Sequence, residues 1–175
     1  LPSAKIIEYG MDGFHRRGYR KSGGAITDYY LYDENNRVVA TLNASGTFKS
    51  VFLYASKSHV PEYFVTGSTK YKIITDYLGS VRLVVRTSDN VVMQRMDYDE
   101  WGKVIADSRP GFQPFGYAGG LYDSETKLVR FGARDYDPTI GRFTVKDPIG
   151  FAGGSANLYT YCGNDPVNCV DRSEE

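Results

Sequence analysis

A hairpin pattern repeats along the first hundred residues and restricts the fold more than any other feature of the chain. In TDYYLYDENNRVVATLNASGTFKSVFLYA, an aromatic strand ends in a Tyr-Asp pair, and a polar turn separates it from a short apolar strand. The turn is predicted at residues 33–36, because Asp favours turns and Asn tolerates the left-handed backbone conformation. Tyr30 and Tyr32 are expected on one face of their strand, since side chains alternate between faces.

The pattern recurs along the chain. In DYLGSVRLVVRTSDNVVMQRMDYDEWGKVI, residues 99–102 are predicted to form a turn after another Tyr-Asp pair, and residues 87–90 to form a second turn. A weaker copy covers residues 6–19. Recurrence at roughly 20-residue spacing predicts a repeat architecture, in which each hairpin buries its faces by stacking on its neighbours.

The composition agrees with a β-rich chain and limits its partners. The sequence holds 15 Tyr, 9 Phe and 19 Gly, and aromatic residues suit strands whereas Gly suits turns. The formal net charge is zero, so the overall charge gives no basis for binding nucleic acid or an anionic membrane. No apolar run approaches the roughly 20 residues that span a bilayer, and the first ten residues have no signal-peptide core.

Local charges and sulfur atoms suggest structural roles. The basic cluster FHRRGYRK, residues 14–21, is interpreted as the solvated face of a hairpin rather than a nucleic-acid contact. His15 and His59 are far apart in the sequence, so neither a metal site nor a cofactor is expected. Cys162 and Cys169 could form a disulfide if their segments fold back, but buried free thiols are the expectation.

Five motifs then occur in a fixed order: TDYLGSVRLV, DYDEWGKVI, FGYAGGLYDSETKLVRFGARDYDP, GRFTVKDPIGFAGG and NLYTYCGNDPVNCVD. Together with the Tyr-Asp pairs, they make the chain resemble the Rhs repeat-associated core domain. That domain ends the YD-repeat shells of Rhs polymorphic toxins and of the C component of insecticidal Tc toxin complexes. The match is dense over residues 74–171 and looser before them.

The resemblance implies a mostly β fold in which antiparallel YD-repeat hairpins form part of a hollow β-shell. Residues 1–105 are expected to be YD-repeat hairpins, and residues 106–175 an inward-spiralling core or plug region. The implied function is the C-terminal end cap of a shell that encapsulates a toxin encoded downstream in the same chain. The aromatic and apolar residues of the terminal third are expected to form the core of this plug: Phe143, Phe151, Leu158, Tyr159 and Tyr161.

Self-cleavage is a property of many members of the resembled family, and its residues match Asp147, Asp171 and Arg134. Two close carboxylates do not both ionise easily, so one can act as an acid while the other activates water. The arginine would hold one carboxylate charged. The structural alternative assigns Asp147 to turn formation beside its Pro, as for most charged residues of such a segment.

The end of the sequence departs from the family. Asp171 is followed by Arg-Ser-Glu-Glu, whereas the family has Pro-x-Gly-Leu with the cut after Leu. The expected cleavage site is therefore Glu175, and the autoprotease is either active or vestigial. Whether the chain is an enzyme stays open, and no turnover of an external substrate is expected.

Partners and location follow from the same resemblance. The chain is too short to close a cavity for a toxin domain. The remaining shell, in the same or a separate chain, or self-association through an open β-edge is expected to complete it. A bacterial protein that is secreted or exported to the cell surface is expected. The alternative function is a non-enzymatic surface module, an orphan YD-repeat fragment that binds a partner through exposed aromatic strands.

Overall fold

The fold is an antiparallel β structure. A computed structural model describes residues 5–150 and 157–170. Its larger sheet has ten strands in chain order: β1 (Ile7–Met11), β2 (Arg17–Ser22), β3 (Ala25–Tyr32), β4 (Val38–Leu42), β5 (Phe48–Leu53), β6 (Tyr63–Thr66), β7 (Thr69–Thr75), β8 (Val81–Arg86), β9 (Val92–Tyr98) and β10 (Val104–Asp107).

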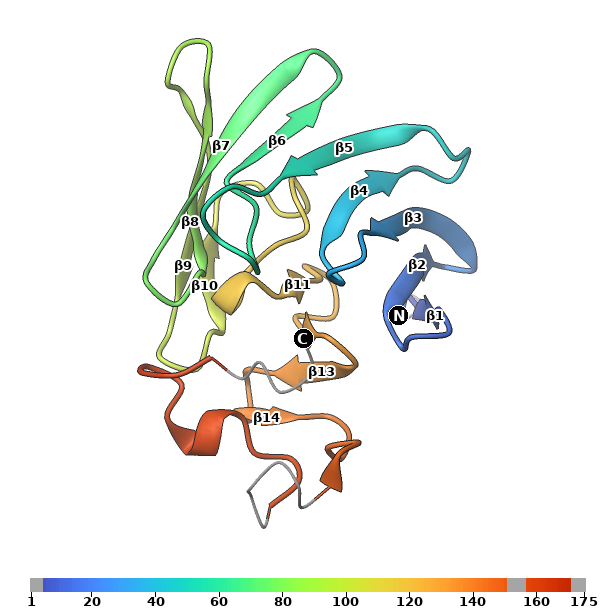
Figure 1. Cartoon of the computed structure of the whole chain (residues 1–175), viewed down its shortest axis with the longest axis vertical. Coiled ribbons are helices and arrows are strands. Elements are labelled where there is room, and N and C mark those ends of the chain that lie inside the picture. Colours follow the sequence, from blue (N-terminus) through green and yellow to red (C-terminus); the bar gives the residue numbers. More distant parts are fainter. Residues whose placement is uncertain (1–4, 151–156, 171–175) are drawn as a thin grey trace.

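Every strand of this sheet pairs with the next strand in the chain, and the pairings are antiparallel. Figure 1 shows that the sheet bends into an arch, from β1 at one end over β5–β7 to β10 at the other. Twist accumulates from strand to strand, and several register shifts add local bends. The prediction of a mostly β fold built from antiparallel YD-type hairpins is confirmed.

An aspartate at the start of each predicted Tyr-Asp turn organises it. The Asp33 backbone N–H donates to Arg37 O, and its carboxylate accepts the backbone N–H groups of Asn35 and Arg37. Asn36 takes the left-handed conformation at φ 60°, which Asn tolerates. The same arrangement recurs at Asp12, Asp76 and Asp99, so the predicted turns at residues 33–36 and 99–102, and the weaker copy, are confirmed.

The tyrosine before the turn has a separate role. The Tyr32 hydroxyl donates to the carbonyl of Arg17 at 3.1 Å, and that of Tyr98 donates to Val81 at 2.9 Å. Each acceptor opens the strand that follows a preceding Asp turn, so the tyrosine connects two hairpins. Burial raises the pKa of Tyr32 to about 12, so its hydroxyl stays a donor even at pH values where an exposed tyrosine ionises.

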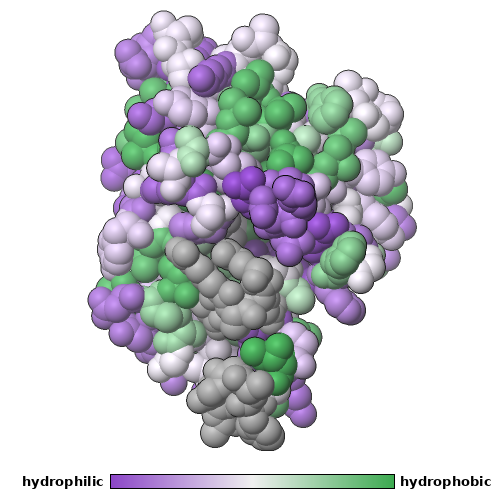
Figure 2. Space-filling model, in the orientation of Figure 1, coloured by the Kyte–Doolittle hydropathy of each residue, from purple (hydrophilic) through white to green (hydrophobic). Residues whose placement is uncertain are grey.

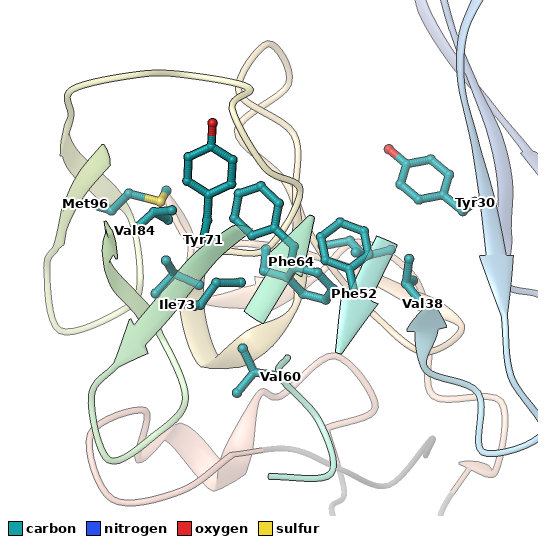
Figure 3. Packing of buried hydrophobic residues seen from close by; sticks show 12 residues of the cluster. Tyr30, Val38, Phe52, Val60, Phe64, Tyr71, Ile73, Val84 and Met96 are labelled. Carbon is teal, nitrogen blue, oxygen red and sulfur yellow. The ribbon is translucent and has the colours of Figure 1, made fainter. Parts of the chain in front are cut away.

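The main core lies between the sheet and the chain that follows β10. Phe64 is fully buried and packs with Phe52 and Tyr71 (Figure 3). The segment of residues 112–122 returns across the same face of the sheet, where Phe115 contacts Phe52 with ring centroids 5.1 Å apart. The arch in Figure 1 therefore has this segment packed beneath it.

A smaller sheet continues the chain and has its own aromatic core. It contains β11 (Leu121–Tyr122), β12 (Val129–Phe131), β13 (Arg134–Asp137) and β14 (Arg142–Phe143), and two 3₁₀ turns flank it, η1 (Tyr117–Gly119) and η3 (Cys162–Asn164). Among the residues expected in the plug core, Phe143 and Tyr161 are buried, whereas Leu158 and Tyr159 are half-buried. Phe151 lies outside the described residues.

The two cysteines differ from the expectation of free buried thiols, which is wrong. Cys162 and Cys169 form a disulfide, and both are only half-buried. The η3 turn folds the chain back, because Cys162, Gly163 and Asn164 all take positive φ values.

Within residues 5–150 and 157–170, the structure has no helix of the length and apolarity needed to cross a membrane. The division at residues 105 and 106 stays a prediction.

Candidate functional site

Two of the three residues predicted to be catalytic lie together. Arg134 opens β13 and is 2% exposed, and its Nη1 lies 3.3 Å from Oδ2 of Asp147. The Arg134 guanidinium also lies over the ring of Phe143, 3.7 Å from its centroid. The ring and the carboxylate therefore fix the orientation of the guanidinium.

Asp147 also holds the turn around the following proline. Its Oδ1 accepts the backbone N–H of Ile149 at 2.9 Å, and its own N–H donates to Leu158 O at 2.9 Å. The structural role and the contact with Arg134 thus use different oxygens of one carboxylate. This arrangement leaves the Asp147 carboxylate oriented and partly accessible to solvent.

The remaining predicted site residues, Asp171 and Glu175, lie outside the described residues. The pairing of two aspartates, and the cut itself, therefore stay predictions. Within the described residues, the site consists of the oriented carboxylate of Asp147 beside the buried Arg134.

A buried ionic cluster that the sequence interpretation missed joins the first hairpin to the smaller sheet. Asp135 accepts from two arginines through different oxygens, Arg17 Nη2 and Arg130 Nη1, each at 3.0 Å. Arg17 is 1% exposed, and its guanidinium lies over the Tyr9 ring at 3.8 Å. Arg130 also donates to the backbone carbonyl of His15. Sequence pattern could have found the Arg130–Asp135 pair, since the two residues face each other across a tight hairpin.

A second link lies beside the first. Asp123 accepts from Arg20 Nε at 2.6 Å and from the Tyr9 hydroxyl at 2.7 Å. Arg20 also donates to Glu125, which accepts from Lys5 as well. The interpretation of residues 14–21 as a solvated face is wrong for Arg17 and Arg20, because Arg17 is buried and Arg20 half-buried, and both pair with acidic residues of a distant segment.

The second link predicts a pH dependence. Burial alone would raise the pKa of Asp123, but hydrogen bonds from Arg20, Tyr9 and the Glu125 backbone outweigh it and lower the pKa to about 2. The unfolded carboxyl has a pKa near 3.8, so the stabilisation is present above pH 4 and disappears as the pH falls toward 2. The wild type is expected to have a higher free energy of unfolding than Asp123→Asn above pH 4. This difference should shrink by about 2 kcal/mol as the pH falls toward 2. Urea unfolding of both proteins at a series of pH values measures this, and a constant difference between them contradicts it.

A cavity of about 530 Å³ lies between the Asp turns and the chain around Gly120. Three arginines line it: Arg16, Arg37 and Arg130. Their guanidinium groups pair with Asp12, Asp33 and Asp135 respectively, so these charges are largely compensated. Arg16 and Arg37 each have their own carboxylate, whereas Arg130 shares Asp135 with Arg17.

The sequence of the chain is similar to one family of proteins over nearly its whole length. A family model described as Teneurin YD-shell matches residues 2–167. Teneurin-3 of Danio rerio is 30% identical over 182 residues, which cover 99% of this chain and 7% of that protein. Teneurin-1 of Gallus gallus is 32% identical over 177 residues, 96% of this chain and 6% of that protein. Salivary gland surface protein 1 of Aedes aegypti is 30% identical over 186 residues, 96% of this chain and 5% of that protein.

Solved structures agree on the fold. The crystal structure of TcdB2-TccC3-TEV superposes with a TM-score of 0.71 at 17% identity, covering 99% of this chain and 9% of that one. TcdB2-TccC3 without its hypervariable C-terminal region gives a TM-score of 0.61 at 18% identity, with 99% and 10% coverage. The chain spans less than a tenth of the length of the teneurins and the salivary gland protein that it matches by sequence.

Proposed function

Because the chain belongs to the teneurin YD-shell family, we propose that it forms the closing end of a larger β-shell that encloses a polypeptide. One observation carries the proposal: residues 112–122 turn back and pack against the inner face of the ten-stranded arch. A chain that returns beneath its own sheet fills the space at that end. Residues 1–105 act as wall, and residues 106–175 act as the cap.

The wall needs further strands. Within the described residues, β1 pairs only with β2, and β10 pairs only with β9. The outer backbone groups of such strands are free to pair with another strand. We propose that YD repeats of the same or a separate chain add there, with self-association as the alternative arrangement.

The cap is proposed to cut its own chain. Arg134 holds Asp147 in a fixed orientation, and Asp171 is proposed as the second carboxylate, with the scissile bond after Glu175. One carboxylic acid would donate a proton to the leaving amine while the other carboxylate activates water. The released C-terminal toxin domain would stay enclosed until the shell opens.

Export of the protein is part of the same proposal. The disulfide between Cys162 and Cys169 supports it, because disulfides persist in oxidising compartments and are rare in the cytosol. A secreted or surface-exposed location would therefore suit this chain.

The test of self-cleavage uses a chain extended beyond Glu175 by a folded reporter. Intact-mass spectrometry is expected to find the parent divided after Glu175, and Asp147→Asn and Arg134→Ala whole. The matched control is Asp137→Asn, which changes a turn aspartate near Arg134 and leaves the Arg134–Asp147 pair in place, and it should divide like the parent.

If the parent stays whole while circular dichroism reports a folded β protein, the self-cleavage proposal is rejected. The shell-wall proposal then remains, together with the alternative of a surface binding module. Binding of the chain to added YD repeats separates these two, since a wall section requires it and an independent module does not.

A further inference from the structure

The disulfide loop at the C-terminal end of the described chain joins two parts of the molecule. The loop runs from Cys162 to Cys169 and lies at the lower end of the sheet in Figure 1. Tyr161 precedes it and is fully buried, and Val170 follows it and packs against the same aromatic cluster. The loop is therefore held at both ends by the core of the smaller sheet.

Two tyrosines hold the middle of the loop. The buried Tyr117 donates its hydroxyl to Pro166 O at 2.6 Å, and Tyr77, from the turn between β7 and β8, donates to Val167 O. Pro166 itself is buried. These two contacts connect the loop to both sheets.

The backbone of the loop is in an unfavourable conformation. Cys162 and Asn164 have φ values of 49° and 67°, on either side of Gly163 at 61°. The left-handed region costs free energy for residues with a Cβ, and for Cys there is no local compensation of the kind that Asn has. The Cys162–Cys169 bond closes the loop that contains this turn and constrains it covalently.

The bond is also open to reagents. Both cysteines are half-buried, and the residues on the outside of the loop are exposed: Gly163, Asn164, Asp165, Val167 and Asn168. Figure 2 shows hydrophobic and hydrophilic areas side by side on one face of the molecule, with a hydrophobic area in the upper middle of the view. A thiolate needs this kind of access to attack a disulfide sulfur.

We propose that Cys162–Cys169 is a redox-modification site for a dithiol reductant, and that its reduction releases residues 161–170 from the aromatic core. The dithiol thiolate attacks one sulfur, a mixed disulfide forms, and the second thiol of the reductant resolves it. Two electrons and two protons pass to the protein, which gains two thiols, and the reductant becomes a cyclic disulfide. The left-handed turn then relaxes, and Pro166 and Val167 leave Tyr117 and Tyr77. This proposal does not depend on self-cleavage.

Hydrogen exchange measured by mass spectrometry on the folded chain tests the proposal, with dithiothreitol as the probe and alkylation to trap the thiols. Reduction is expected to raise exchange in residues 157–170 by about tenfold or more, and to leave β3–β8 unchanged. The Cys162→Ser/Cys169→Ser variant should show the fast exchange without reductant and no response to it. Failure of alkylation after native reduction, or unchanged protection of residues 157–170 in the reduced wild type, overturns the proposal.

Discussion

Replacing Asp135 by asparagine is expected to lower the free energy of unfolding by about 3 kcal/mol, one of the two largest effects that we predict. Asp135 accepts from both Arg17 and Arg130, which are 1% and 7% exposed. Without the carboxylate, two buried guanidinium groups face each other with no counter-charge at this position. Urea unfolding followed by circular dichroism measures the loss.

The control for this change is Asp97→Asn. Asp97 also accepts from two arginines, but Arg95 is exposed and Arg82 and Asp97 are only half-buried, so their interaction is expected to be weaker. Asp97→Asn should unfold close to the wild type. A similar midpoint of urea unfolding for both variants would show that the ion pairs of Asp135 contribute no more to stability than those of Asp97.

A double-mutant cycle separates the charge effect from packing. Arg17→Met removes one of the two cations and keeps the Arg130–Asp135 pair. The combination of Arg17→Met with Asp135→Asn should then cost about 1–3 kcal/mol less than the sum of the single changes, because the two side chains interact directly. Additive losses would contradict the assignment of Asp135 to Arg17.

Local turn chemistry explains why the hairpins were predictable from sequence. Asp33 binds backbone groups at most four residues away, and Asn36 supplies the left-handed residue within the same turn. These interactions are complete within a short stretch of sequence, so residue types alone indicate them. The predictions at Asp33 and Asp99 were therefore correct at the level of single residues.

Contacts between distant segments were not predictable in this way. Arg17 and Asp135 are 118 positions apart, and nothing near Arg17 in the sequence indicates that a carboxylate covers it. The prediction of free cysteines was wrong for a related reason. Cys162 reaches Cys169 only through a left-handed turn, a conformation that Cys rarely adopts. The Arg134–Asp147 pair came from family resemblance rather than from spacing.

Replacing Phe64 by alanine is the second large prediction, with an expected loss of about 4 kcal/mol. Phe64 has no exposed surface, and its ring lies 5.9 Å from Phe52, 4.9 Å from Tyr71 and 5.7 Å from Phe112. Truncation therefore leaves a cavity among rings that cannot all move into it. Phe48→Ala is the matched control on the neighbouring strand β5, since Phe48 is 62% exposed, and it should change stability by less than about 0.5 kcal/mol.

The way in which Phe64→Ala unfolds also tests the division of the chain. Phe64 belongs to β6, whereas Phe112 belongs to the region predicted as the cap, and the two rings are in contact. If the arch and the returning segment form one cooperative unit, tryptophan fluorescence of Trp101 and circular dichroism should report the same lowered midpoint. If residues 106–175 unfold separately, the two midpoints will differ, and the cap is then an independent domain attached to the wall. A single transition instead means that a shell end of this kind is stable only when wall and cap fold together, since each covers the apolar face of the other.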